Sequence, residues 1–190
     1  QGFAVSMGER QADAASVAAP VLDADGPVAV ISVCGPIERF RDKVVVITKV
    51  GSDMGQGHTD LTRDWILRAA EASLRRLRID AIDLYLAHWP DDRTPTDETL
   101  GAFQTLIETG KVRAIGASNY SAPRLTEALA VSARLGLPRY ETLQPGYNLA
   151  DRSGYEAELQ AVCVAQGLSV IPYYSLASGT RDGFLEICVR

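Results

Sequence analysis

Short apolar runs alternate with amphipathic stretches from about residue 43 onward. The runs share the length and the β-branched content of buried strands. They lie at residues 44–49, 82–87, 112–117, 142–144 and 168–174. Because parallel neighbouring strands need a crossover, and each gap has room for one helix, the alternation predicts a parallel sheet of βα units. Periodicity leaves a barrel and a doubly wound sheet both open, although no Gly-x-Gly-x-x-Gly follows a strand, which disfavours a dinucleotide-binding doubly wound fold.

Helices are predicted in the four gaps, from apolar positions spaced three or four residues apart. Their expected buried positions are Ile66, Ala70, Leu74 and Leu77 in the first helix, Leu100, Phe103 and Ile107 in the second, Leu125, Leu129 and Ser132 in the third, and Tyr155, Leu159 and Val162 in the fourth. The last three helices also carry end signals. Their starts are marked by Thr94 before Pro95, by Ser121, and by a capping box of Ser153 with Glu156, and their ends by Gly110, Gly136 and Gly167.

Residues 1–37 have a different texture from the rest of the chain. Apolar runs at residues 15–22 and 28–33 flank the sequence DADG at positions 23–26, a pattern typical of a β-hairpin. Pro20 places the first run at a sheet edge or ends it early, because proline cannot donate a ladder hydrogen bond. At the other end of the chain, residues 180–190 have no clear pattern, although 184–189 could hold one short strand.

The composition is that of a folded globular protein of about one domain. Hydrophobic residues make up 46% and charged residues 23% of the 190 positions, and the mean hydropathy is -0.01. The net charge of -5 comes without a Lys/Arg cluster, which argues against nucleic acid or an anionic membrane as a partner. The sequence contains no run of about 18 apolar residues, so no membrane span is expected. The N-terminus lacks the pattern of a signal peptide. The three widely spaced cysteines fit a reducing cytosol, so a cytoplasmic location without disulfides or a zinc site is expected.

Polar side chains follow every predicted strand of the parallel sheet. They are Lys49, His88, Ser118 with Asn119, Gln144, and Tyr173. Each alone has an ordinary structural explanation: a strand-end lysine is usually solvated, a histidine beside a tryptophan is usually packed, and a loop asparagine often satisfies backbone groups. Functional residues of α/β proteins, however, gather at the carboxyl ends of parallel strands. These successive polar ends therefore predict one common site.

Segments around these residues resemble motifs of the aldo/keto reductases, in the family's order. They are residues 41–49 (RDKVVVITK), 83–90 (DLYLAHWP), 110–119 (GKVRAIGASN), 143–148 (LQPGYN) and 167–179 (GLSVIPYYSLASG). The resemblance covers about residues 38–179. It implies a (β/α)8 barrel that uses NADPH to reduce aldehydes and ketones, and the strands here look like the third to seventh of the eight.

The resemblance also implies a role for each polar strand end. Lys49 and His88 resemble the family's catalytic lysine and histidine. Ser118, Asn119 and Gln144 resemble the residues that hold the nicotinamide carboxamide, and Tyr173 resembles the aromatic residue that stacks on the nicotinamide ring. The residues expected in the loop that approaches the cofactor phosphates are Ser175, Leu176 and Ser178. The expected substrate is a small-molecule carbonyl compound, and no metal ligand is implied.

Two parts of the family's site have no counterpart in these residues. The family's tyrosine acid, and the aspartate that pairs with its lysine, lie upstream of the lysine, but none of the seven tyrosines here precedes Lys49. The eighth strand, with its basic loop for the adenosine 2′-phosphate, has no counterpart after Gly179. We therefore expect impaired reductase activity and weak NADPH binding. Lys49 is expected to be either exposed or paired with a substitute acid such as Asp53, because burying an unpaired ammonium is costly.

Residues 1–37 resemble part of the effector-binding domain of IclR-type transcription regulators. The resemblance is carried by residues 2–6 (GFAVS), 8–10 (GER), 14–23 (AASVAAPVLD) and 27–36 (PVAVISVCGP). The expected organisation is thus a hairpin segment at 1–37, a reductase-like barrel fragment at 38–179 and an unassigned tail at 180–190. In fold class this is an α/β protein: a partial (β/α)8, TIM-barrel-like parallel sheet preceded by an N-terminal antiparallel β-hairpin.

The alternatives differ in whether the chain is an enzyme. The first is an NADPH-dependent aldo/keto reductase that is impaired in this chain, and the second is a non-enzymatic folded chimera of a regulator fragment and a reductase fragment. A ligand-binding regulatory piece is least favoured, since the regulators' helix-turn-helix is absent. Because five parallel strands cannot close an eight-stranded barrel, the hairpin is expected to join the sheet and cover one edge. Open sheet edges also predict a homodimer.

Overall fold

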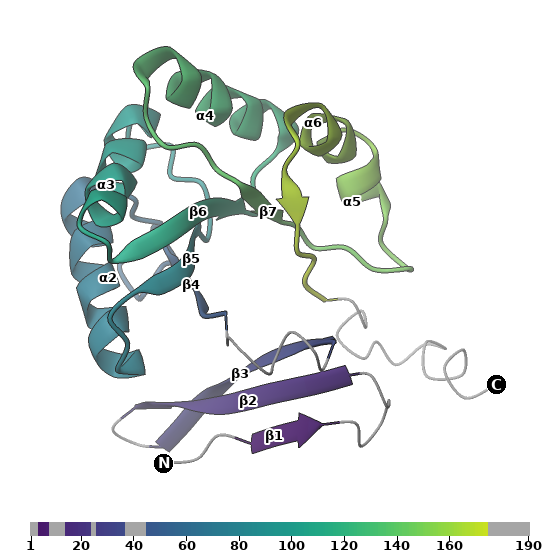
Figure 1. Ribbon diagram of the computed structural model, residues 1–190. Helices are drawn as coiled ribbons and strands as arrows, with labels where there is room; N and C mark the ends of the chain where they lie inside the picture. Colours follow the sequence, from purple (N-terminus) through teal and green to yellow (C-terminus); the bar gives the residue numbers. More distant parts are fainter. Residues whose placement is uncertain (1–3, 8–13, 24–25, 37–44, 175–190) are drawn as a thin grey trace. The chain divides into compact units, whose positions relative to one another are not determined.

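The computed structural model describes residues 4–7, 14–23, 26–36 and 45–174 of the chain. The chain divides into two compact units, Gln1–Val45 and Val46–Arg190 (Figure 1). The expected strand at 184–189 and the expected site residues Ser175, Leu176 and Ser178 lie outside the described residues.

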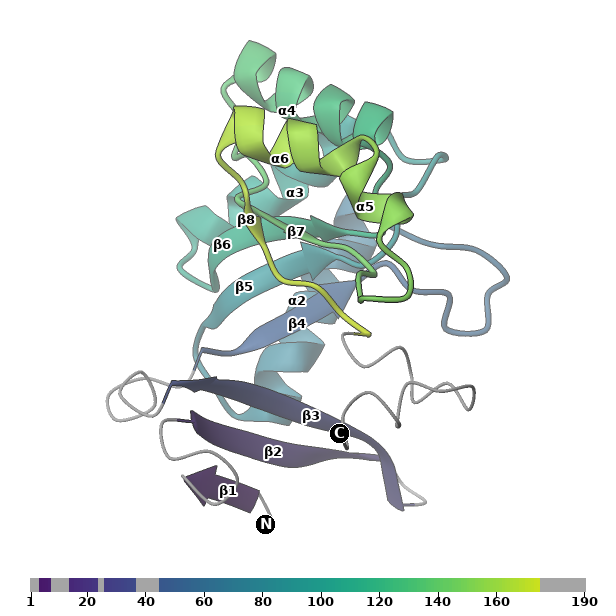
Figure 2. The same cartoon turned by 90° about the vertical axis from the view of Figure 1, so that its right-hand side faces the viewer.

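The second unit contains the predicted parallel sheet with its crossover helices. Its strands are β4 (Ile47–Val50), β5 (Ile82–Ala87), β6 (Val112–Ser118), β7 (Thr142–Gln144) and β8 (Ser169–Val170), and they lie side by side in chain order. Its helices are α2 (Arg63–Leu77), α3 (Thr96–Glu108), α4 (Ala122–Leu135), α5 (Ser153–Glu156) and α6 (Leu159–Gln166). Figures 1 and 2 show these helices along one side of the sheet, as same-handed βα crossovers require. The sheet is therefore consistent with part of a TIM-barrel-like fold.

An aromatic cluster fills the layer between the sheet and the helices. The ring of Tyr85 on β5 meets Phe103 on α3 edge to face at 5.8 Å, and Phe103 meets Tyr140 at 6.3 Å. Tyr140 also packs against Tyr120, with ring centroids 5.6 Å apart, and these rings are all buried. Such edge-to-face pairs stabilise a core by about 0.5–1.5 kcal/mol each beyond the burial of their area. This packing holds β5 and β6 in fixed positions, and with them the residues at the ends of these two strands.

Helix α4 matches the sequence prediction at both ends. The Ser121 side chain accepts a hydrogen bond from the Arg124 amide at 3.4 Å, and the helix ends at Gly136 with φ of 65°. Leu125, Leu129 and Ser132 are buried on its inner face, as predicted.

Helices α2 and α3 depart from the prediction by small amounts. In α2, Leu77 was expected to be buried but is 37% exposed, whereas Ser73, which was not predicted, is buried. The expected N-cap at Thr94 is wrong: α3 begins at Thr96, because the Thr94 hydroxyl donates to Asp91 Oδ2 at 2.6 Å. Leu100 and Phe103 are buried as predicted, whereas Ile107 is only partly buried.

The fourth predicted helix is broken into α5 and α6. Its expected capping box is wrong, since Ser153 makes no capping hydrogen bond and the Glu156 carboxylate accepts hydrogen bonds from Tyr147 Oη and Arg152 Nε at 2.7 and 2.8 Å. Both hydrogen bonds end on Glu156 Oε1, and neither joins Glu156 to a backbone N–H group at the helix start. Of the three expected inner positions, Leu159 is buried, while Tyr155 and Val162 are partly buried.

The first unit contains the predicted hairpin and one strand more. β2 (Ala14–Asp23) pairs antiparallel with β3 (Gly26–Pro36), and β1 (Ala4–Met7), which the sequence did not predict, pairs with β2. Among the described residues, β1 pairs with β2 as far as Ala18, two positions before Pro20. The described strands form one sheet of three strands and one of five, and the expected pairing of the hairpin with the parallel sheet stays a prediction. The added partner β1 makes the hairpin a sheet of three strands.

Candidate functional site

The predicted polar residues lie at one edge of the parallel sheet. His88 follows β5, Ser118 ends β6 with Asn119 next to it, Gln144 ends β7, and Tyr173 lies after β8. Residues 146 and 173 form a further parallel bridge, which extends the pairing of β7 and β8 to this edge. The parallel direction of the strands therefore brings these side chains to a common edge.

Hydrogen bonds connect three of these strand ends into one chain of contacts. Tyr173 Oη donates to Asn119 Oδ1 at 2.5 Å, and Asn119 Nδ2 donates to the His88 carbonyl at 2.9 Å. Ser118 Oγ donates to the Gln144 carbonyl at 2.9 Å, which adds the end of β7. We call Tyr173, Asn119, His88, Ser118 and Gln144 the strand-end network. Because the side chains of Tyr173, Asn119 and Ser118 each bond to another strand end, the network fixes the relative positions of these ends.

Backbone geometry explains why the network contains Asn119. Its φ is 59°, in the left-handed region, where asparagine is among the few non-glycine residues found regularly. Its amide donates to the Gln144 carbonyl at 3.4 Å. This bend at the end of β6 brings the side chain between His88 and Tyr173.

Tyr173 depends on a glycine beside it. A Cβ built on Gly146 would lie 3.2 Å from the Tyr173 ring, closer than ordinary contacts. The Tyr173 amide donates to the Pro145 carbonyl at 2.9 Å and its carbonyl accepts from the Tyr147 amide at 3.2 Å. The segment around Gly146 therefore packs closely against the Tyr173 ring.

Gln144 offers an unused polar atom at the same edge. Its Oε1 is buried and has no hydrogen-bond partner among the described residues. A buried acceptor without a partner costs free energy unless a ligand or water supplies a donor. A primary carboxamide, such as that of nicotinamide, carries N–H donors of the required kind. The donor and acceptor types of Gln144 and Ser118, together with the Tyr173 ring, thus fit a nicotinamide group.

His88 lies between the network and the end of β4. Its amide donates to the Val50 carbonyl at 2.7 Å, and its Nδ1 lies 2.5 Å from Ser52 Oγ. Its ring stacks on Trp89 with centroids 5.9 Å apart. Burial, and secondarily the positive charge of Lys49, lower the pKa of the His88 imidazole. The neutral form of the ring is therefore favoured near neutral pH.

Lys49 is exposed, in agreement with the first of the two expectations for it. The pairing with Asp53 is wrong: the Asp53 carboxylate accepts hydrogen bonds from the amides of Gly55 and Gly57 at 2.8 and 2.9 Å. These backbone hydrogen bonds, that from Gly55 first, lower the pKa of Asp53. Among residues 45–174 no carboxylate forms an ion pair with Lys49. Desolvation by the surrounding protein lowers the pKa of its ammonium.

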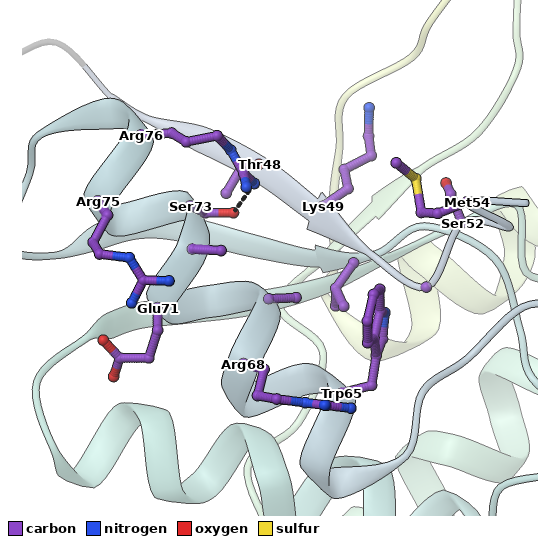
Figure 3. Close-up of a pocket in the computed structure, with 14 residues that line it drawn as sticks. Thr48, Lys49, Ser52, Met54, Trp65, Arg68, Glu71, Ser73, Arg75 and Arg76 are labelled. Carbon is purple, nitrogen blue, oxygen red and sulfur yellow. Dashed lines mark hydrogen bonds between the residues drawn. The ribbon is translucent and has the colours of Figure 1, made fainter. Parts of the chain in front are cut away.

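A cavity that the sequence did not indicate lies between β4 and α2. Its volume is about 750 Å³, and Trp65 and Met54 line it together with Lys49 and Ser52. Figure 3 shows the Lys49 side chain pointing away from Trp65 and Arg68. His88, Asn119, Gln144 and Tyr173 do not line this cavity, so it is distinct from the strand-end network. The one sequence feature that could have pointed to it is the spacing of Trp65 and Arg68, which places both on one face of α2. The Arg68 guanidinium lies 5.7 Å from the centre of the Trp65 ring.

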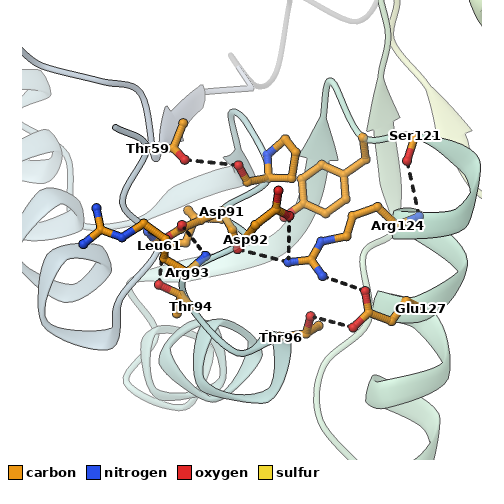
Figure 4. A network of polar contacts seen from close by, with 12 residues as sticks. Thr59, Leu61, Asp91, Asp92, Arg93, Thr94, Thr96, Ser121, Arg124 and Glu127 are labelled. Carbon is orange, nitrogen blue, oxygen red and sulfur yellow. Dashed lines mark hydrogen bonds and ion pairs between the residues drawn. The ribbon is translucent and has the colours of Figure 1, made fainter. Parts of the chain in front are cut away.

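A second polar cluster anchors the loop that follows His88 (Figure 4). The buried Asp91 carboxylate accepts hydrogen bonds from Thr94 Oγ1 at 2.6 Å and from the amides of Leu61 and Arg93 at 3.0 Å. Arg124 on α4 donates to the Asp91 carbonyl at 3.0 Å. Burial alone would raise the pKa of Asp91, but the hydrogen bonds outweigh it and hold the pKa below its usual range. The sequence did not indicate this role for Asp91, because Asp92 beside it has the same side chain and yet is exposed.

Three further tyrosines, Tyr85, Tyr147 and Tyr174, lie in the same unit as the strand-end network. Tyr85 is fully buried in the aromatic core with an unpartnered hydroxyl, and burial raises its pKa. Tyr147 donates to Glu156, and this hydrogen bond raises its pKa. Tyr174 is 64% exposed and has φ of 58°. Neither Tyr85 nor Tyr147 has a hydroxyl bonded to the strand-end network; among the described tyrosines, only Tyr173 does.

The sequence model of the aldo/keto reductase family matches residues 5–186. The chain belongs to the aldo/keto reductase family. Relatives include the aldo-keto reductase YhdN of Bacillus subtilis (strain 168), 36% identical over 145 residues, which are 75% of this chain and 42% of that protein. A probable voltage-gated potassium channel subunit beta of Oryza sativa subsp. japonica is 38% identical over 145 residues, which are 75% of this chain and 44% of that protein. The L-glyceraldehyde 3-phosphate reductase of Escherichia coli (strain K12) is 29% identical over 146 residues, which are 76% of this chain and 42% of that protein.

The family match begins well before the motifs quoted from the sequence. It includes the segment at 5–37 for which a likeness to IclR-type regulators was expected, and the comparisons do not show that likeness. The chain spans less than half the length of these curated relatives. Among the described residues no helix is long and apolar enough to cross a membrane, and no group of histidine, cysteine and carboxylate side chains could hold a metal ion.

Proposed function

We propose that this aldo/keto reductase family member is an NADPH-dependent reductase of small aldehydes and ketones whose activity is impaired in this chain. The observation that supports this most is the strand-end network, in which His88, Asn119 and Tyr173 are joined by hydrogen bonds beside the unpartnered acceptor of Gln144. Its residue types match the needs of a nicotinamide and a carbonyl group at one edge of a parallel sheet.

Each network residue has a role in this proposal. Bound NADPH supplies the hydride that reduces the carbonyl carbon. Ser118, Asn119 and Gln144 hold the carboxamide, and the Tyr173 ring lies against the nicotinamide. Ser175, Leu176 and Ser178, outside the described residues, contact the phosphates.

His88 and Lys49 serve the carbonyl oxygen, on which negative charge grows as hydride arrives. His88 donates a hydrogen bond to that oxygen and so stabilises the developing charge. In the family's reaction Lys49 lowers the pKa of the tyrosine that donates the proton, because a neighbouring ammonium favours the ionised tyrosine. Lys49 is placed at the end of β4, next to the loop that carries Ser52 toward His88.

A second candidate, a folded chimera without enzymatic activity, is favoured by the sequence upstream of Lys49. No tyrosine stands there to donate the proton. In this alternative residues 1–37 are a fragment related to IclR-type effector domains, and residues 38–179 a reductase fragment. Open edges of the parallel sheet would pair two copies of the chain, in the cytoplasm.

Turnover tests whether the chain is a catalytically active reductase by itself. We expect the purified 190-residue chain to show no NADPH oxidation above background with 4-nitrobenzaldehyde or methylglyoxal, since loss of a general acid alone removes about 10²–10⁴-fold of the rate. The assay follows NADPH absorbance, with a reductase of this family that contains the tyrosine as the positive control. Robust turnover that His88→Ala abolishes would instead show that another residue has taken over proton donation.

Binding tests the cofactor site independently of turnover. We expect weak NADPH binding by fluorescence titration, reduced by Asn119→Ala and by Tyr173→Ala. Tyr173→Phe separates the two functions of Tyr173, because it keeps the ring and removes only the hydroxyl that bonds Asn119. Gln160→Ala, at an exposed position of α6, is the matched control and should leave binding unchanged. Equal binding by all four variants would rule out the strand-end network as the nicotinamide site.

A further inference from the structure

Ser52 is placed against His88 by the backbone at the end of β4. The His88 amide donates to the Val50 carbonyl at 2.7 Å, and this bond brings the ends of β4 and β5 together. Gly51 then turns the chain with φ of 95°, in the region that favours glycine. A Cβ on Gly51 would lie 2.5 Å from Leu61 Cδ2, so the absence of a side chain permits the turn. Ser52 Oγ arrives 2.5 Å from His88 Nδ1.

Two proton arrangements can join a serine hydroxyl to a neutral imidazole nitrogen. In one the hydroxyl donates to Nδ1, and in the other an Nδ1–H group donates to the hydroxyl oxygen. Within the part of the chain that the structure describes, Ser52 Oγ has no second hydrogen-bond partner. The first arrangement therefore gives the hydroxyl proton an acceptor within the described protein, and it leaves the ring proton on Nε2.

We propose that Ser52 is a positioning residue that holds His88 in the Nε2–H tautomer, so that the imidazole presents an N–H donor to a carbonyl oxygen. Nε2 has no hydrogen-bond partner among residues 45–174 and is left to a ligand. Burial and the charge of Lys49 favour the neutral ring, in which the tautomer decides whether Nε2 donates or accepts. A neutral imidazole N–H group can polarise a carbonyl group. The catalytic meaning rests on the proposed reductase function, whereas the tautomer is a property of the folded chain.

The tautomer can be read directly, because the chain has only two histidines, His58 and His88. Long-range ¹H–¹⁵N correlation spectra of the ¹⁵N-labelled 190-residue chain at about pH 8 distinguish a protonated from an unprotonated ring nitrogen. For His88 we expect a protonated Nε2 and an unprotonated, hydrogen-bonded Nδ1. A native chain with His88 protonated on Nδ1 would overturn the proposal without any variant.

Variants at Ser52 then test the cause. In Ser52→Ala the ratio of Nδ1–H to Nε2–H tautomer should rise about fivefold, as expected for one ordinary hydrogen bond. Ser52→Thr keeps a hydroxyl and should restore the native ratio. Thr59→Ala is the matched control, since that nearby loop hydroxyl donates to the Pro90 carbonyl, and it should leave the His88 signals unchanged. An unchanged ratio in Ser52→Ala would refute the role of Ser52, whereas an Nε2–H ring in a chain that binds no NADPH would count only against the reductase function.

Discussion

The two sides of the candidate site differ in how many of their side chains are held by hydrogen bonds. On the side of β5 to β8, every side chain except Gln144 makes a hydrogen bond to a neighbouring strand or loop, and Asn119 bonds to both Tyr173 and His88. On the side of β4, Lys49 is exposed and has no ion-pair partner among the described residues. The difference indicates that the side chains at the ends of β5 to β8 are held in place by the fold of these residues, whereas Lys49 has no such partner among them.

The largest loss of stability should come from adding a side chain where β5, β6 and β7 lie closest together. A Cβ on Gly116 would lie 2.6 Å from both the Thr142 carbonyl oxygen and Leu86 Cδ2, so backbone must move. We expect Gly116→Ala to lower the free energy of unfolding by about 3 kcal/mol or more, the upper end for overpacking a core. Urea unfolding followed by tryptophan fluorescence measures this.

A glycine on a neighbouring element provides the control for Gly116. Gly101 lies in α3 with no atom within 4 Å of its would-be Cβ, so Gly101→Ala should stabilise the chain by about 0.5–1 kcal/mol through helix propensity. Equal effects of the two alanines would show that the close approach of β5, β6 and β7 does not hold these strand ends in place.

The next largest effect should come from the carboxylate that anchors the loop after His88. Asp91→Ala removes three hydrogen bonds to a buried charged acceptor, and we expect a loss of about 2–3 kcal/mol. Asp92→Ala, at an exposed position beside it, should change stability by less than about 0.5 kcal/mol. Both tryptophans lie in Val46–Arg190, so their fluorescence reports on this unit.

Acid should remove the contribution of Asp91. Its pKa is lowered in the folded state, so its contribution is complete above the unfolded pKa of about 3.9 and is lost as the pH falls through the folded value. The difference in unfolding free energy between the native chain and Asp91→Ala should therefore shrink below about pH 4. A difference independent of pH down to about pH 2 would show that the carboxylate charge is not what stabilises the loop.

The smallest effect should come from the lysine side. Because Lys49 is exposed and unpaired among the described residues, Lys49→Met should change the free energy of unfolding by less than about 1 kcal/mol. A loss of several kcal/mol in the same urea experiment would reveal a buried partner, and the contrast between the two sides would then fail.

The sequence predicted those features that depend on local signals or on the direction of strands. Ser121 and Gly136 act within one turn of α4, and the polar strand ends gather because parallel strands share an edge. The sequence did not reveal contacts between residues far apart in the chain. Ser52 and His88 are separated by 36 positions, and nothing in the local sequence distinguishes the buried Asp91 from the exposed Asp92. The expected capping box failed although it is a local pattern, since the Glu156 carboxylate bonds to Tyr147 and Arg152 instead of to the helix start.

The order of the strands predicts that some residues of the site open locally more often than others. β5, β6 and β7 pair on both sides, whereas β4 and β8 are the outer strands of the five-stranded sheet. Amide deuterium uptake by local fraying therefore starts at the outer strands, since fewer interstrand bonds must break there. Lys49 lies on one outer strand and Tyr173 just beyond the other, while His88, Asn119 and Gln144 end the inner three. We therefore expect local opening to release Lys49 and Tyr173 first and to leave His88, Asn119 and Gln144 in register.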